Sequence, residues 1–228
     1  MLNKELIEYA ETHSTPEPHL LATLNRETHL TQVSPQMLSG HLQGTLLRMI
    51  SHMIRPNRVL EIGTFTGYSA INLALGLNKT VEQSSGSQGL SGAREGKSVL
   101  HTIELNPELE DGIRRFIREA GLEEQIILHI GNALEIIPRL DETWDLVFID
   151  ADKSNYLNYY HMVFPKVSTG GFIVADNCLW DGKVLENPEQ MDQDTRGIVE
   201  FNEFVHCDKR VENILLPFRD GLMVMLKL

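Results

Sequence analysis

The stretch Leu60–Ala70 reads LEIGTFTGYSA and joins an apolar run to a glycine turn and the start of a helical pattern. Glycines in such a turn let the backbone approach a ligand closely, and the first turn of the following helix offers free N–H groups. A strand, a glycine turn and a helix in this order are typical of nucleotide-type sites in open α/β sheets. The stretch therefore predicts such a site, although a turn in which glycine serves packing alone has the same pattern.

The residues around this turn narrow the kind of ligand. Gly63 and Gly67 do not follow the G-x-G-x-x-G spacing of dinucleotide sites, and Glu61 would repel a pyrophosphate. An acid at this point instead suits a cationic ligand, such as the amino group of S-adenosylmethionine (SAM).

Short apolar runs alternate with longer amphipathic segments on both sides of this stretch. The runs are Arg58–Ile62, Val99–Glu104, Gln125–Ile130, Asp145–Asp150, Gly171–Asp176, Asn213–Pro217 and Leu222–Lys227. Helices are expected at Tyr68–Leu77, Pro107–Ala120 and Tyr156–Lys166. This alternation predicts a parallel sheet covered on both faces. The last two runs are separated only by FRDG, which predicts an antiparallel hairpin. We expect an α/β fold: a Rossmann-like, doubly wound, mostly parallel seven-stranded sheet with a C-terminal antiparallel hairpin.

The chain before this sheet is expected to form covering helices. Ser14–Pro16 and the pair Ser34-Pro35 both resemble helix starts, with a cap followed by proline. A stripe at helical spacing predicts one buried face formed by Leu38, Leu42, Leu46, Met49 and Met53. We expect one domain over residues 1–228, with residues 1–55 as the helical cover. Residues 79–98, rich in glycine and serine, are expected to be a flexible surface insertion, or alternatively a substrate lid.

Charge and composition exclude several classes of function. The 228 residues carry 20 Lys+Arg against 32 Asp+Glu, a net charge of −12. A chain so acidic gains nothing from general counterion release, which argues against binding to nucleic acid or to an anionic membrane. Two cysteines make no disulfide framework, and no apolar stretch suits a signal peptide or a membrane span. These features predict a soluble, cytoplasmic protein.

Glu104 ends the second apolar run, where an acid can accept hydrogen bonds from both ribose hydroxyls of a nucleoside. Without residues 79–98, its separation from Glu61 is close to the ~20 residues usual in such units. The spacing therefore favours a ribose-binding acid over a solvated surface charge.

Carboxylates also end two later runs, FIDADKSNY (Phe148–Tyr156) and VADNCLW (Val174–Trp180). Asp150, Asp176 and Asn177 would bring three hard oxygen ligands together from neighbouring strands. Such a set suits Mg²⁺ and leaves coordination positions open for a substrate. Each motif taken alone is also compatible with simple capping of the turn that follows it.

Lys153 follows Asp150 closely enough to reach the same site. A lysine beside a metal in a partly dry pocket can act as a general base. The alternative is a surface lysine that pairs with Asp152.

Together these motifs resemble a known family. They occur in the order TQVSP (31–35), LEIGTFTGYSA, TIELNPEL (102–109), GNALEIIPRL (131–140), FIDADKSNY, DNCLW (176–180) and LPFRDGL (216–222). This set is similar to the caffeoyl-CoA and catechol O-methyltransferases, which are small, metal-dependent class I SAM methyltransferases, and within them to the plant and bacterial branch. Thr31 departs from the methionine common in the family, and residues 185–198, where the family varies its acceptor loop, carry no strong motif.

The resemblance implies a set of site residues. The SAM contacts would be Val33, Glu61, Gly63, Thr64, Phe65, Ser69, Glu104, Ala133 and Asp150. Asp150, Asp176 and Asn177 would hold Mg²⁺ or another divalent cation such as Ca²⁺ or Mn²⁺, with Lys153 and Asp150 as the catalytic residues. Trp180 and Asn177 would contact the acceptor; for Trp180, the equal alternative is a packed residue after its strand.

The implied reaction is methyl transfer from SAM to a hydroxyl of a catechol-like phenolic small molecule that chelates the metal. The acceptor itself is not identified by the sequence, and a homodimer is expected. Three alternatives stay open at this point: a tRNA hydroxyuridine O-methyltransferase on the same fold, an NAD-dependent oxidoreductase, and a non-catalytic binding module.

Overall fold

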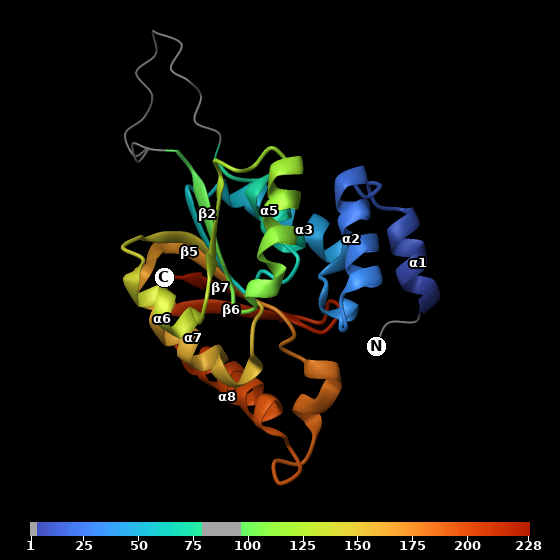
Figure 1. The fold of residues 1–228 in the computed structure, drawn as a ribbon. Coiled ribbons are helices and arrows are strands. Elements are labelled where there is room, and N and C mark those ends of the chain that lie inside the picture. Colours follow the sequence, from blue (N-terminus) through green and yellow to red (C-terminus); the bar gives the residue numbers. More distant parts are fainter. Residues whose placement is uncertain (1–3, 79–96) are drawn as a thin grey trace.

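Figure 1 shows a computed structural model of the chain, which describes residues 4–78 and 97–228. The segment expected to be a flexible insertion, 79–98, lies outside the described residues except for Lys97 and Ser98. The described residues form a seven-stranded sheet in the order β3-β2-β1-β4-β5-β7-β6. Its strands are β1 (Arg58–Ile62), β2 (Val99–Glu104), β3 (Ile126–Ile130), β4 (Trp144–Ile149), β5 (Val167–Ala175), β6 (Val211–Leu216) and β7 (Leu222–Lys227).

The pairing of these strands confirms the predicted architecture. β1 to β5 pair in parallel, while β7 lies between β5 and β6 and is antiparallel to both. The chain order reverses direction across the sheet at β1 and β4, so helices cover both faces, as expected of a doubly wound sheet. The C-terminal hairpin of β6 and β7 is the one predicted from the short FRDG connection.

Helices pack on both faces of the sheet (Figure 1). They are α1 (Lys4–Thr12), α2 (His19–Thr31), α3 (Gly40–Ile54), α4 (Tyr68–Ala74), α5 (Glu110–Glu119), α6 (Ala133–Ile136), α7 (Tyr156–Val163) and α8 (Gln193–Cys207). One apolar core joins the sheet to α2, α3, α4 and α5, and a second joins its other face to α6, α7 and α8. Within the described ranges, no helix is both long and apolar enough to cross a membrane.

Two expectations for the N-terminal helices are wrong. α2 begins at His19 rather than at Ser14–Pro16, because Pro18 is extended (ψ 140°) and a proline also disfavours the helical conformation of the residue before it. The buried face of α3 consists of Gln43, Gly44, Leu47 and Ser51, whereas Met49 and Met53 of the predicted stripe are 54% and 75% exposed.

The small residues on α3 explain why that face is buried. A Cβ atom on Gly44 would lie 2.5 Å from the Tyr68 ring, so α3 and α4 approach more closely than any larger side chain allows. Ser51 adds a hydrogen bond by donating from its hydroxyl to the Leu73 carbonyl at 2.7 Å. A search for apolar residues alone cannot find a face on which glycine, serine and glutamine accompany a single leucine.

Two further elements differ from the expected pattern. β5 begins at Val167 rather than Gly171, because Gly170 (φ +79°) accommodates a shift in the pairing with β4 instead of ending the strand. α8 lies in a region where no helix was predicted. Its start is capped by Asp192, whose carboxylate accepts from the Thr195 N–H at 2.7 Å.

Candidate functional site

The carboxyl ends of four neighbouring strands lie in register along one edge of the sheet. Ile62 of β1 pairs with Ile103 of β2 and with Ile149 of β4, and Ile149 pairs in turn with Ala175 of β5. The residues that follow these positions include most of those singled out in the sequence. The edge therefore places the predicted ligand residues in one row, where open α/β sheets bind ligands.

The glycine turn after β1 is shaped by its closeness to β4. Gly63 has φ +98°, and a Cβ atom there would lie 1.8 Å from the Asp150 carbonyl oxygen. The Gly63 and Thr64 N–H groups both donate to the Ile103 carbonyl, at 3.0 and 3.2 Å. Gly67 (φ +92°) then opens α4. The turn is fixed by backbone contacts on both sides, to β2 and to β4.

Glu61 is a fully buried carboxylate near the end of β1. One of its oxygens accepts from the Thr102 hydroxyl at 2.5 Å, while the other has no hydrogen-bond partner among the described residues. Burial raises the pKa of Glu61 to about 8; the Ser69 and Thr102 side chains oppose this rise, and the nearby carboxylates of Asp150 and Glu104 add to it. A buried acid with an unpartnered oxygen is costly to ionise, which fits a site that receives a cation.

Glu104 at the end of β2 holds the glycine turn in place. One carboxylate oxygen accepts from the Phe65 N–H at 2.7 Å and the other from the Asn106 N–H at 2.8 Å. Burial raises the pKa of Glu104, and these backbone donors oppose the rise. A carboxylate offers about four acceptor positions, so two remain for the hydroxyls of a ligand.

The other residues expected around SAM divide into two groups. Thr64, Ser69 and Ala133 are buried on the elements that border the turn. Val33, by contrast, is fully exposed in the connection after α2. α2, which precedes that connection, is linked to the glycine turn, because the Thr28 hydroxyl donates to the Thr66 hydroxyl at 3.0 Å.

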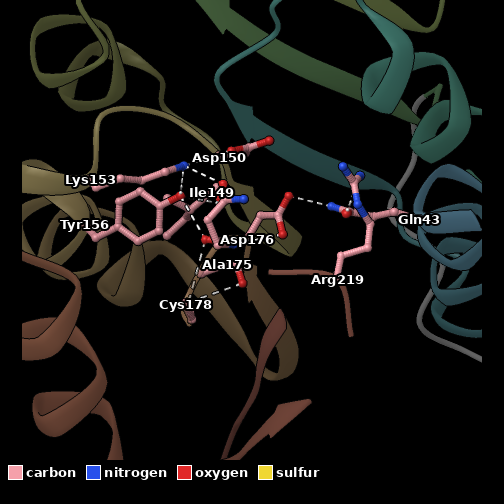
Figure 2. Close-up of polar contacts among 10 residues, drawn as sticks. Gln43, Ile149, Asp150, Lys153, Tyr156, Ala175, Asp176, Cys178 and Arg219 are labelled. Atoms are coloured by element: carbon pink, nitrogen blue, oxygen red, sulfur yellow. Dashed lines mark hydrogen bonds and ion pairs between the residues drawn. The ribbon is translucent and has the colours of Figure 1, made fainter. Parts of the chain in front are cut away.

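The second half of the site is formed by the residues after β4 and β5, where the Lys153 side chain points toward Asp150 and Tyr156 (Figure 2). Lys153 Nζ donates to Asp150 Oδ1 at 3.0 Å, to the Tyr156 hydroxyl at 2.8 Å and to Asn177 Oδ1 at 2.7 Å. The side chain is only 8% exposed. The alternative of a surface lysine paired with Asp152 is therefore wrong, because Asp152 instead accepts from the Tyr159 hydroxyl.

Asp176, after β5, is the most enclosed carboxylate of this half. Its Oδ2 accepts from Gln43 Nε2 at 2.6 Å, and its Oδ1 accepts from the Asn177 N–H at 2.8 Å. Burial raises the pKa of Asp176 to about 6, and repulsion from Asp150 contributes.

The donor chemistry of this half fits a divalent cation. Among the described residues no three His, Cys, Asp or Glu side chains form a metal-binding group, so a metal here would need an amide oxygen as well. Asn177 provides that oxygen beside Asp150 and Asp176. Two neighbouring carboxylates with an amide oxygen adjacent form a set of hard ligands suited to Mg²⁺.

Trp180 borders the same space. Its ring lies 5.7 Å from Lys153 Nζ and 5.8 Å from Lys183 Nζ, measured to the ring centroid. The indole N–H is buried and has no partner among the described residues. Trp180 and Asp181 both have positive φ, 46° and 51°, an unusual backbone that directs the ring.

Three residues of the site escaped the sequence analysis as site residues. Tyr156, fully buried, accepts from Lys153 and donates from its hydroxyl to the Asp176 carbonyl at 3.1 Å. Its spacing of three from Lys153 was a usable signal, since such residues share one side of a helical turn. Gln43 and Arg219 are remote in sequence from the strand ends, and no pattern in the sequence connects them with Asp176.

Comparisons with known proteins agree on one family. A family model described as O-methyltransferase matches residues 11–228. The caffeoyl-CoA O-methyltransferase 1 of Eucalyptus globulus is 32% identical over 190 residues, which cover 79% of this chain and 70% of the relative. The O-methyltransferase of Bacillus cereus, solved in complex with SAH, is 25% identical with a TM-score of 0.84, covering 98% of this chain and 97% of that one. TomG of Streptomyces achromogenes, an O-methyltransferase of tomaymycin synthesis solved with SAM, is 27% identical with a TM-score of 0.82, covering 100% and 99%.

Proposed function

The chain belongs to this O-methyltransferase family, and from that premise we propose that it methylates one hydroxyl of a catechol-like small molecule held by a divalent metal. Its SAM-dependent methyltransferase activity follows from the family. Membership of this family argues against two of the alternatives left open by the sequence, the NAD-dependent oxidoreductase and the non-catalytic binding module. The substrate class and the metal are the proposed parts.

One observation carries the proposal. The row of strand ends has two adjacent halves: Glu61 and Glu104 beside the glycine turn, and Asp150, Lys153 and Asp176 next to it. Asp150 stands between the halves, because its backbone contacts the turn and its carboxylate contacts Lys153. A methyl donor in the first half and a hydroxyl in the second would then meet at Asp150.

The first half suits SAM on chemical grounds. The unpartnered oxygen of Glu61 would accept from the cationic amino group, and the free acceptor positions of Glu104 would take the ribose hydroxyls. We assign Gly63, Thr64, Phe65, Ser69 and Ala133 to the surrounding surface. Val33 is fully exposed in the connection after α2. It would contact SAM only if the cofactor extends to that connection.

The second half suits a chelated acceptor. Asp150, Asp176 and Asn177 would hold Mg²⁺, or Ca²⁺ or Mn²⁺ in its place. When bound, such a cation lowers the pKa of a coordinated hydroxyl and fixes its position. As a neutral amine, Lys153 Nζ would accept the proton that the hydroxyl gives up, and as an ammonium it would attract the oxyanion that forms. Tyr156 keeps Nζ in place. Holding both substrates at attack distance accounts for most of the expected rate.

The acceptor is proposed to be a phenolic small molecule rather than RNA. Trp180 provides an aromatic wall with an unused N–H donor beside Lys153, which suits a flat ring with an oxygen substituent. The net charge of −12 is unfavourable for a polyanionic acceptor such as tRNA. The relatives named for caffeoyl-CoA support the same substrate class.

A methyl-transfer panel tests the proposal. The chain would be incubated with labelled SAM and either catechols, caffeoyl esters, flavonoids with vicinal hydroxyls, or undermodified tRNA, each with and without Mg²⁺. Matched phenols with a single hydroxyl are the control for chelation. We expect transfer to vicinal diols only, dependent on the metal. Transfer to tRNA, or equal transfer to monophenols, would contradict the assigned substrate class. The expected homodimer is likewise a proposal, for which sedimentation equilibrium is the test.

A further inference from the structure

A residue that is not itself a proposed metal ligand holds the Asp176 carboxylate (Figure 2). Gln43 of α3 donates from Nε2 to Asp176 Oδ2 at 2.6 Å, although the two residues are 133 positions apart in the chain. Both side chains are enclosed, at 1% and 4% exposure. A short hydrogen bond between two buried groups fixes the direction of the carboxylate more firmly than a contact in water would.

Gln43 is itself fixed by a second residue. Arg219, in the turn between β6 and β7, donates from Nη1 to Gln43 Oε1 at 2.9 Å and from Nη2 to the Leu38 carbonyl at 3.3 Å. A guanidinium only donates hydrogen bonds, so the end of the amide that faces Arg219 must be its oxygen. The NH₂ group of Gln43 must then face Asp176. Arg219 therefore sets the orientation of the amide.

The two residues come from different parts of the chain, and the hairpin turn that carries Arg219 is hydrogen-bonded to the segment after β5, where Cys178 and Leu179 donate to the Gly221 and Asp220 carbonyls. α3 belongs to the N-terminal helices, and Arg219 (φ +51°) to the C-terminal hairpin turn. The opposite side of the site has its own set of contacts, because Lys153 donates to both Asp150 and Asn177 there. Asp176 is the one proposed metal ligand that Gln43 contacts among the described hydrogen bonds.

We infer that Gln43 and Arg219 are positioning residues, which hold the Asp176 carboxylate in its ligating direction and thereby set the affinity of the site for a divalent cation. This inference rests on the proposed function, since it requires Asp176 to be a metal ligand. Partners that orient metal ligands typically change metal affinity by about 10–100-fold when they are removed. Neither residue is expected to touch SAM or the acceptor.

Titration with Mn²⁺, followed by the electron paramagnetic resonance signal of the free ion, measures this affinity without any turnover. Gln43→Met keeps the side-chain length and removes both hydrogen bonds, and we expect its Kd for Mn²⁺ to rise about 10–100-fold. Arg219→Met should raise the Kd as well, and Arg219→Lys should restore part of the loss. Because Arg219 acts through Gln43, the double variant should bind Mn²⁺ no more weakly than Gln43→Met alone.

Two controls separate positioning from general damage. Gln36→Met and Arg114→Met make the same chemical changes at exposed positions and should leave the Kd for Mn²⁺ unchanged. The Kd for SAH should stay constant in all variants. If Gln43→Met fails to fold, Arg219→Met still decides, because its side chain is at the surface.

The outcomes are distinct. If both Gln43→Met and Arg219→Met have a Kd for Mn²⁺ within twofold of that of the unchanged chain, the inference is wrong. The proposed metal site is then unaffected. A parallel loss of SAH affinity would also overturn the inference, because the defect would then be general. If the unchanged chain binds no Mn²⁺, the metal part of the proposed function is wrong and this inference is wrong with it.

Discussion

Gly63 and Asp150 are in such close contact that a single added Cβ atom on Gly63 would lie 1.8 Å from the Asp150 carbonyl oxygen. The Asp150 N–H also donates to the Ile62 carbonyl, directly before Gly63, at 2.8 Å. The turn proposed for SAM and the acid proposed for the metal therefore share one rigid piece of backbone. Any shift of one moves the other, which is how two substrates can be held at a constant separation.

Gly63→Ala should disrupt both halves of the site at once. The new methyl group would overlap with backbone atoms, which cannot rotate away as a side chain can, and φ +98° is itself unfavourable for alanine. We expect a loss of about 3 kcal/mol in the free energy of unfolding. SAH binding, measured by calorimetry, should fall below detection.

The matched control is Gly112→Ala on α5, where a Cβ atom meets nothing within 4 Å. That change should stabilise the chain by about 0.5–1 kcal/mol, because alanine favours the helix. Urea unfolding of both variants compares them directly. Equal stabilities for the two would contradict the close contact of Gly63 with Asp150.

The raised pKa of Glu61 makes cofactor binding depend on pH. With a pKa of about 8 in the ligand-free chain, the carboxyl is mostly protonated at pH 6. An amino cation pairs with the ionised form alone, so binding must release a proton, and affinity must increase as the pH rises toward 8. The Kd for SAH should fall by roughly tenfold per pH unit between pH 6 and 7.5.

Glu61→Gln provides the control for this pH effect. The amide cannot ionise, so the variant should bind SAH more weakly, with a Kd that no longer changes over the same pH range. Calorimetry in buffers of different ionisation enthalpy counts the released proton. A Kd for the unchanged chain that is flat from pH 6 to 7.5 would show that Glu61 does not pair with the ligand's amino group.

Much of the fold was predictable because it depends on local patterns. Each expected strand exists, and β1, β2 and β7 match in both bounds. For β1 and β2 the reason is that buried parallel strands are continuous apolar runs with clear ends. The strand-end acids were predictable for a related reason: in a parallel sheet, residues at the ends of successive strands meet at one edge. Glu61, Glu104, Asp150 and Asp176 needed no knowledge of tertiary contacts.

The remaining features depend on contacts that no local pattern encodes. Gln43 is buried on α3 because Gly44 and Ser51 let that face pack closely, whereas the more apolar Met49 and Met53 stay exposed. α8 was missed because its buried residues include Thr195 and its first turn is polar, so the apolar stripe is short. The link from Arg219 to Asp176 spans the chain and exists only in the folded molecule.

Lys153→Met tests the proposed proton acceptor. The variant keeps the length of the side chain but removes the group that contacts Asp150, Tyr156 and Asn177. General acid–base groups contribute about 10²–10⁴-fold, so kcat should fall by that factor. The Kd for SAH should stay within threefold. Lys209→Met, at an exposed position, is the matched control and should keep full turnover; unchanged turnover in Lys153→Met would rule out its role.

Removal of metal tests the carboxylate pair. Treatment with EDTA followed by desalting should abolish methyl transfer, and Mg²⁺ should restore it, because Asp150 and Asp176 are proposed to hold the acceptor through the cation. Asp176→Asn should need a higher Mg²⁺ concentration for half-maximal rate, since one charge is lost. Full activity in the presence of EDTA would refute the metal-dependent reaction.

Two variants of Trp180 test whether its ring forms a wall of the acceptor site or only packs within the fold. Trp180→Phe keeps a ring beside Lys153 but removes the unpartnered indole N–H, while Trp180→Leu removes both. If the ring stacks on the acceptor, Trp180→Leu should raise the acceptor KM about tenfold, the equivalent of ~1.4 kcal/mol, and Trp180→Phe should raise it less. The Kd for SAH and the thermal midpoint should change little in either variant. A lower midpoint with an unchanged acceptor KM would instead identify Trp180 as a packing residue, because the loss would then lie in the fold and not in the encounter with substrate.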